Sequence, residues 1–423
     1  MQQRYPRLSA DDSRTEATTE SEVTAGVINP DHKRENRLLR LCLELRPGES
    51  RLDSIRRTLS PELDWEHIFQ FAERQGLVPL LYHQFNRFHF DSIPAEYQKR
   101  FKNGYQANVA RTLILSDELL ALTEELRSQG IDSLPYKGPL LGAIAFGDPA
   151  LRCFIDLDII VRPRDVSKAI QILQARGYQL ARNIDARQTQ MLLASQHNIQ
   201  FERDDGHLIV ELHWRVAADL FASALNPEYL WDNLELVILN RVQLNSLPFE
   251  ELLLALCIHG TRHMWDRLSQ ICDIAALICT DRKIDWQRLM AVAKEADVER
   301  MLLLGLCLAD ELTENALPAN IRESITSDRA IRRLADRIFA RLFSDNSPIR
   351  LGPREVLQDN LLVRKSLSAR IRYCLFALSP ADADFETVAL SRYLNFAYYG
   401  LRPFRMMVSA LRREKRRSQP SVR

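Results

Sequence analysis

Hydrophobic residues recur at three- and four-residue intervals through most of the first 130 residues and again after Pro248. The runs RLLRLCLEL, DWEHIFQFAERQGLVPLLYHQF and ANVARTLILSDELLALTEELRSQG show this spacing, which places apolar side chains on one face of a helix. Gly130 follows the last run, and glycine commonly ends a helix. We therefore expect helices over residues 36–130 and 248–401, with breaks in the second region near Pro318, Pro348, Pro353 and Pro380.

Between residues 131 and 247 the pattern changes to short apolar runs. IDSLPYK, FIDLDIIV, NIQFE and HLIVELHW are rich in β-branched and aromatic residues, whereas VSKAIQILQARG has helical spacing. Short strands that alternate with helices predict a small mixed sheet with helices packed on it. The expected fold is therefore α+β, with a small mixed-sheet core over residues 131–247 flanked by N- and C-terminal helical regions.

The two ends of the chain differ in composition from the rest. Residues 1–35 are rich in Ser, Thr, Asp, Glu and Arg, so we expect a disordered lead that buries too little apolar surface to offset chain entropy. Residues 402–423 carry eight Lys or Arg and one Glu, a net charge of +7. Such a basic tail is solvated, or it binds an anionic membrane surface or RNA.

The overall balance of charge argues against a dedicated nucleic-acid coat or an acidic solvating tail. The 423 residues carry 57 Lys and Arg against 56 Asp and Glu, a net charge of +1, and 46% of them are hydrophobic. No stretch approaches the roughly 18 apolar residues of a membrane span, and the N-terminus lacks the apolar region of a secretory signal. The seven cysteines form no CxxC pair. These features predict a cytoplasmic protein without integral membrane association.

The run RCFIDLDIIV contains two acids, Asp156 and Asp158, in an otherwise apolar segment. On a strand, residues two apart project to the same face about 7 Å from each other. Two carboxylates on so apolar a strand are costly unless a cation compensates them, and Mg²⁺ is a usual partner. The alternative is an ion-pair network with Arg152 or Arg162. The opposite face of the strand is expected to be buried through Ile155, Leu157, Ile159 and Val161.

The run HLIVELHW offers a third acid, Glu211, on the same face of a strand as Ile209 and His213. Three carboxylates from two neighbouring strands can hold one or two Mg²⁺ ions, or Mn²⁺, against the triphosphate of an NTP. Taken singly, each residue has a structural alternative. Glu211 can be a solvated acid at a strand edge, and His213 can be a packed histidine bonded to the backbone.

Lys137 and Gly138 stand where the apolar run IDSLPYK ends, and Pro139 follows at a favourable first position of a helix. A strand-to-helix junction directs free backbone N–H groups at an anion. Gly138 would let a phosphate approach the backbone, and Lys137 would add a positive charge. The alternative is a purely structural helix start. Neither GxxxxGK[ST] nor GxGxxG occurs, which argues against P-loop and Rossmann nucleotide binding.

The order of these motifs resembles a known family. An apolar strand, KG, a helix, R-x-x-x-D-x-D before an apolar run, a helix ending at Gly177 and Tyr178, and a strand with ELHW are together similar to the uncharacterised nucleotidyltransferase family of the DNA polymerase β-like superfamily. The resemblance extends from about Arg37 to RPFR near the C-terminus and includes HGTRHMWDRL and DIAAL. The Gly-Ser pair usual in the superfamily is replaced here by Lys137 and Gly138.

The resemblance implies a nucleotidyltransferase that uses an NTP as substrate and Mg²⁺ or Mn²⁺ as cofactor. Asp156, Asp158 and Glu211 would be the catalytic, metal-binding acids. The acceptor hydroxyl could belong to a small molecule, a tRNA end or a protein. Two alternatives remain: a catalytically inert binding or scaffold protein of the same fold, and a toxin-like nucleotidyltransferase that modifies tRNA. The residues on the nucleotide and phosphate side would be Lys137, Gly138, Arg152 and His213.

His259 and His263 are four residues apart in a predicted helix, so they share one face. HGTRH lacks the glutamate of the HExxH zinc-protease motif, and HMWD lacks the adjacent His-Asp pair of an HD-type phosphohydrolase. We expect a structural role, or a role facing the substrate together with Trp265 and Asp273.

Overall fold

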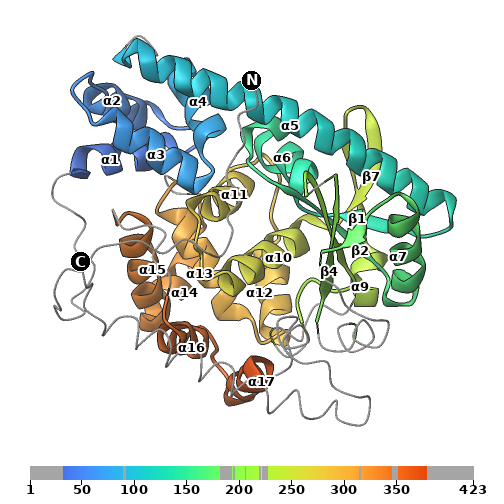
Figure 1. Cartoon of the computed structure of the whole chain (residues 1–423). Coiled ribbons are helices and arrows are strands. Elements are labelled where there is room, and N and C mark those ends of the chain that lie inside the picture. The colour runs from blue at the N-terminus through green and yellow to red at the C-terminus, as the bar shows by residue number, and fades with distance from the viewer. Residues whose placement is uncertain are drawn as a thin grey trace, which may run out of the picture.

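The computed structural model is mostly helical, with one small sheet set among the helices (Figure 1). Helix α1 begins at Lys33, slightly before the expected end of the N-terminal lead. The rest of the lead and the whole basic tail lie outside the described residues. The structure describes residues 32–88, 92–181, 193, 196–204, 206–218, 221, 227–313, 316–344 and 351–378.

In the part of the chain that the structure describes, helices α1 to α5 precede the sheet. Helix α3 begins where the Asp64 side chain accepts a hydrogen bond from the backbone N–H of His67, and it ends at Gly76 in the left-handed conformation. Helix α5 has 34 residues and is about 51 Å long; it runs across the top of the molecule and lies over the sheet (Figure 1). The bounds are α1 Lys33–Cys42, α2 Glu49–Thr58, α3 Trp65–Gln75, α4 Val78–Phe88 and α5 Ala95–Ser128.

The main sheet has five strands in the order β1-β2-β5-β4-β3. Strands β2 and β5 are parallel, and the other neighbours are antiparallel. This arrangement confirms the predicted α+β class with a small mixed sheet. A separate hairpin, β6-β7, packs beside β1. The bounds are β1 Ser133–Pro135, α6 Gly138–Phe146, β2 Asp156–Val161, α7 Val166–Ala175, β3 Gln179–Leu180, β4 Asn198–Arg203, β5 Leu208–His213, α9 Pro227–Asp232, β6 Glu235–Leu239 and β7 Val242–Ser246.

The apolar face of β2 is buried as predicted, except at one residue. Leu157, Ile159 and Val161 lie in a core that the sheet shares with α5 and α7. Ile155 was expected to be buried with them, but it is 54% exposed. The reason is that β2 begins only at Asp156, so the strand alternation does not extend to Ile155.

The helices after the sheet form a second core together with α1–α4. Gly260 in α10 allows close packing there, because a Cβ at this position would lie 2.5 Å from the Trp265 ring. No helix within the described ranges is long and apolar enough to cross a membrane. The bounds are α10 Phe249–Arg262, α11 Leu268–Ile278, α12 Trp286–Glu295, α13 Glu299–Asp310, α14 Ala319–Ser327, α15 Arg329–Leu342, α16 Pro353–Leu362 and α17 Leu367–Leu378.

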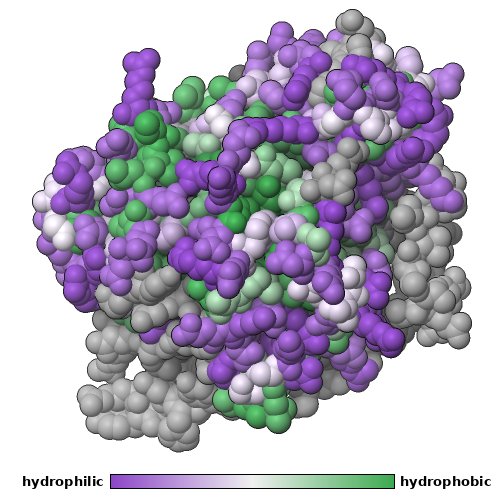
Figure 2. Space-filling model, turned by 180° about the vertical axis from the view of Figure 1, so that it is seen from behind, coloured by the Kyte–Doolittle hydropathy of each residue, from purple (hydrophilic) through white to green (hydrophobic). Residues whose placement is uncertain are grey.

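The face opposite to that of Figure 1 is largely hydrophilic, with hydrophobic residues gathered in separate areas (Figure 2). Exposed apolar side chains include Leu236 and Ile238 on the β6-β7 hairpin and Leu367 and Ile371 on α17. Scattered exposed apolar residues are common on protein surfaces.

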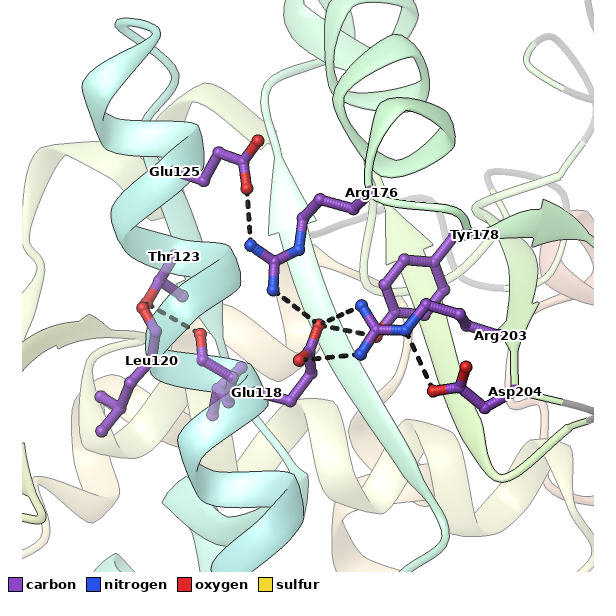
Figure 3. Close-up of polar contacts among 9 residues, drawn as sticks. Glu118, Leu120, Thr123, Glu125, Arg176, Tyr178, Arg203 and Asp204 are labelled. Carbon is purple, nitrogen blue, oxygen red and sulfur yellow. Dashed lines mark hydrogen bonds and ion pairs between the residues drawn. The ribbon is translucent and has the colours of Figure 1, made fainter.

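Glu118 attaches helix α5 to the far edge of the sheet (Figure 3). Its carboxylate accepts hydrogen bonds from Arg176 at 3.1 Å, from both terminal nitrogens of Arg203 at 3.0 and 3.1 Å, and from the Tyr178 hydroxyl at 3.0 Å. Arg176 also donates to Glu125 at 2.7 Å. One carboxylate therefore links α5 to the end of α7 and to β4, and it holds the long helix over the sheet.

Glu118→Gln should lower the free energy of unfolding by about 1–3 kcal/mol, because the neutral amide cannot satisfy two arginines and a buried tyrosine hydroxyl. The measurement is urea unfolding followed by circular dichroism. Glu124→Gln is the matched control on the same helix. Glu124 is 62% exposed and pairs with Arg127, and loss of such a solvated surface pair should change stability far less. Equal effects of the two substitutions would contradict the proposed anchoring role.

Candidate functional site

Strands β2 and β5 bring acidic residues opposite each other at the centre of the sheet. In the parallel register Asp158 pairs with Glu211, and Ile160 pairs with His213. Residues paired across a ladder project to the same face of the sheet. The side chains of Asp158, Glu211 and His213 therefore gather on one face, which follows the alternation in the two sequence runs.

The three side chains touch one another. His213 Nε2 lies 3.0 Å from Asp158 Oδ1 and 3.2 Å from Glu211 Oε2. One donor atom from each residue can be chosen so that all three atoms lie within 4.8 Å of one another. Two carboxylates and an imidazole at such distances are a set of ligands that a divalent cation can bind.

Lys137 also reaches this cluster. Its Nζ lies 2.6 Å from Asp158 Oδ1, and its side chain is only 6% exposed. The lysine occupies the N-cap of α6, and Gly138 follows with a φ of +57°. A Cβ at Gly138 would lie 3.4 Å from the backbone oxygen of Asp156, so the junction passes close to β2. Lys137 was predicted to face a phosphate, but in this structure its ammonium is paired with a carboxylate.

Asp156 lies at the start of β2, opposite Ile209. It is absent from the group of three donors within 4.8 Å, although the sequence pattern placed it beside Asp158 as a metal ligand. Burial raises the pKa of the Asp156 carboxyl to about 6, and the negative charge of Asp158 adds to this shift. Asp156 is thus an acid next to the cluster, and among the described residues no ion pair binds its carboxylate as Lys137 binds that of Asp158.

The charges within the cluster support one another. Burial alone would raise the pKa of Asp158, but Lys137 and the hydrogen bond with His213 outweigh burial and lower it. Burial would raise the pKa of Glu211, but the hydrogen bond from His213 and the charges of His213 and Lys137 together lower it. The pKa of His213 is raised because its bonds to Asp158 and Glu211 outweigh burial. Asp158 and Glu211 therefore stay ionised at neutral pH, while His213 is biased toward its protonated form.

Arg152 does not contact the carboxylates of β2. Its Nε lies 3.0 and 3.1 Å from the two carboxylate oxygens of Asp273 on α11. Arg162 instead pairs with Asp132 at 2.6 Å. The alternative in which these arginines neutralise the Asp pair is therefore wrong for the ion pairs of the described residues. Lys137 and His213 take that role at Asp158.

Two further residues near the cluster were missed from the sequence. Asn198 on β4 donates to Glu211 Oε2 at 2.8 Å, and it pairs with His213 across the sheet. His197, just before β4, has its ring 5.7 Å from the ring of His213, centroid to centroid. In the run HNIQF, the polar residues His197 and Asn198 directly precede apolar strand residues, which could have marked them as site candidates. Only the pairing of β4 with β5 shows that they lie beside His213.

His259 and His263 lie at the end of α10, with ring centroids 4.4 Å apart. They are not among the metal-ligating group found in the described part of the chain, which is Asp158, Glu211 and His213. Burial lowers the pKa of both imidazoles, with contributions from Lys137 and Arg262, and the pKa of His263 falls to about 4. Both rings are therefore neutral at physiological pH.

A comparison with protein-family models matches residues 61–314, more than half of the chain, to a family described as uncharacterised nucleotidyltransferase. The chain belongs to this family. A search of curated proteins found no match.

The match to the uncharacterised nucleotidyltransferase family extends from just before α3 to just after α13. It therefore includes the whole sheet, the carboxylate cluster and the end of α10. This range is narrower than the resemblance noted in the sequence, which began near Arg37 and reached RPFR. The family supports a nucleotidyltransferase activity for the region that contains the cluster.

Proposed function

We propose that the protein transfers a nucleoside monophosphate from an NTP to an acceptor hydroxyl, in a reaction that depends on Mg²⁺. The acceptor oxygen forms a bond to the α-phosphorus, the bond from that phosphorus to the oxygen bridging to the β-phosphate breaks, and pyrophosphate leaves. The proton of the acceptor hydroxyl passes to a base. The observation that carries this proposal is the convergence of Asp158, Glu211 and His213 in a chain of the nucleotidyltransferase family.

The chemistry of the cluster fits a hard divalent cation. Asp158 and Glu211 would hold the ion through carboxylate oxygens, with Asp156 completing the set from the same strand. Lys137 and His213 both contact Oδ1 of Asp158, and neither contact uses Oδ2, so this second oxygen would be available to the metal. Mn²⁺ suits the same oxygen and imidazole donors. When bound, the ion would neutralise charge that develops on the phosphate oxygens.

The protein's own residues would bind and orient the nucleotide. Lys137 supplies a positive charge beside Asp158, and the backbone turn at Gly138 gives close access to the start of α6. Arg152 is held by Asp273 at the edge of this site. Glu211 either completes the set of metal ligands or accepts the acceptor's proton, for which it stays ionised at neutral pH.

A second candidate is an inert binding or scaffold protein of the same fold. One observation favours it: Lys137 and His213 satisfy the buried Asp158 carboxylate without any metal. A toxin-like enzyme that modifies tRNA would perform the same chemistry on a different acceptor, and the basic tail predicted to serve it lies outside the described residues.

Incubation of the purified protein with each α-³²P-labelled NTP, Mg²⁺ or Mn²⁺ and a cell extract tests the proposal. We expect label to move to an acceptor from at least one NTP, and EDTA to stop this transfer. The size of the labelled product then distinguishes a metabolite, an RNA and a protein. Absence of transfer from all four NTPs, together with absence of metal-dependent NTP binding, would instead support the inert scaffold.

A further inference from the structure

Arg262 stands at the last turn of α10, and its guanidinium is held by two histidines. One terminal nitrogen, Nη1, contacts Nε2 of His197, and the other, Nη2, lies 3.0 Å from Nε2 of His263. A guanidinium can only donate, so each imidazole nitrogen accepts. Within the described ranges Arg262 forms no ion pair with a carboxylate.

The two histidines leave the positive charge of Arg262 uncompensated. Each imidazole accepts a hydrogen bond at Nε2 from a guanidinium that can only donate, so this ring nitrogen carries no proton. Both imidazoles are therefore neutral at pH 7. They orient the guanidinium without neutralising it, unlike a carboxylate.

This arginine is connected to the carboxylate cluster through His197. The ring of His197 lies between Arg262 and His213, with centroids of the two imidazoles 5.7 Å apart. The backbone oxygen of His197 also accepts a hydrogen bond from the N–H of Trp214 at 3.0 Å.

The turn that carries Arg262 is rigidly packed. The N–H of Trp265 donates to the oxygen of Gly260 at 2.8 Å, and the Trp265 ring occupies the space that a Gly260 side chain would fill. Trp265 is 1% exposed. Met264 and Trp265 both have positive φ values, of 57° and 51°, and such backbone persists only where the surroundings enforce it. The position of Arg262 is therefore fixed before any ligand binds.

The other two cations assigned to the phosphate side, Lys137 and Arg152, differ from Arg262 because each is paired with a carboxylate. Lys137 is paired with Asp158 at 2.6 Å, and Arg152 is paired with Asp273 at 3.0 Å. Their charges are balanced by the protein. Arg262, half-buried beside the same cluster, retains its full charge and presents a planar group suited to phosphate oxygens.

We infer that Arg262, oriented by His197 and His263, contacts the polyphosphate of the NTP. This inference rests on the proposed function, since it assigns a residue to the substrate of that reaction. It adds a residue at the end of α10, 110 positions after Arg152, to the residues predicted on the phosphate side. It also gives the HGTRH run a role that faces the substrate.

Isothermal titration calorimetry of the full chain with a non-hydrolysable NTP analogue and with inorganic triphosphate, both in Mg²⁺, tests this assignment. Arg262→Gln should weaken binding of both ligands by about 10- to 100-fold, which is the usual effect of losing one charged hydrogen-bond donor. Arg332→Gln, an exposed arginine on α15, removes the same charge elsewhere and should leave both affinities unchanged. Circular dichroism establishes that each variant is folded.

Arg262→Lys separates contact with phosphate from support of the histidines. Lysine keeps the charge but cannot bond both imidazoles, so it should lose less affinity than glutamine. Equal losses in Arg262→Lys and Arg262→Gln, or unchanged binding in Arg262→Gln, would overturn the assignment while the proposed function stands. If the wild-type protein binds neither ligand, the proposed function and the assignment fail together.

Discussion

Asp158→Asn is expected to lower the free energy of unfolding by about 3–5 kcal/mol, the usual cost of removing one partner from a buried ion pair. Lys137 and Asp158 have side chains 6% and 1% exposed, with Nζ and Oδ1 2.6 Å apart. The neutral amide would leave the ammonium of Lys137 buried without its counter-charge, and its oxygen would be a weaker, uncharged acceptor for His213. Urea unfolding at pH 7 measures the loss.

The double variant Lys137→Met/Asp158→Asn is the decisive control for this prediction. Removing both charges leaves no unpaired ion, so the double variant should be more stable than Asp158→Asn alone. Additive losses would show that the two residues do not stabilise each other. A stability of Asp158→Asn equal to that of the wild type would contradict the burial of this ion pair.

Glu211→Gln should reduce nucleotidyl transfer by about 10²- to 10⁴-fold, with a much smaller effect on stability. The substitution keeps the shape of the side chain but removes a negative charge from the proposed metal ligands. A bound metal typically stabilises the transition state by several kcal/mol, and weaker metal binding would lose part of this stabilisation. The Glu211 side chain is 20% exposed, whereas that of Asp158 is 1% exposed. Loss of the Glu211 charge should therefore destabilise the fold less than loss of the Asp158 charge. The initial rate of label transfer measures the effect, and the urea midpoint checks the fold.

The matched control is Glu323→Gln on α14, outside the region matched to the nucleotidyltransferase family. This exposed glutamate should be replaceable without loss of transfer. If Glu211→Gln retained the wild-type rate, Glu211 would be neither a metal ligand nor a base, and the inert scaffold would gain support.

The face on which the acids gather was predictable from strand alternation. Asp158 in FIDLDIIV and Glu211 in HLIVELHW each interrupt an apolar run, so the acids must leave the core on the face opposite to Leu157 and Leu212. Alternation within one strand does not show how two strands pair. The register that sets Asp158 against Glu211, and Asp156 against Ile209, is visible only in the folded sheet.

Contacts between distant segments explain why Lys137 and Arg152 pair with carboxylates although the sequence predicted that they face a phosphate. Lys137 meets Asp158 because the start of α6 packs against β2, and Arg152 meets Asp273 from 121 positions away. The sequence around a lysine or arginine does not show whether its partner in the folded protein is a phosphate or a carboxylate. The proposed role of Arg262 was hidden for the same reason, since His197 contacts it from 65 positions away.

Parallel incubations with α-³²P- and γ-³²P-labelled forms of the active NTP test nucleotidyl transfer most directly. The proposed reaction places the α label on the acceptor and the γ label in pyrophosphate, and both products disappear with Glu211→Gln but persist with Glu323→Gln. Appearance of the γ label on the acceptor would show phosphoryl transfer instead of nucleotidyl transfer. Transfer that survives Glu211→Gln unchanged would place the chemistry outside the carboxylate cluster.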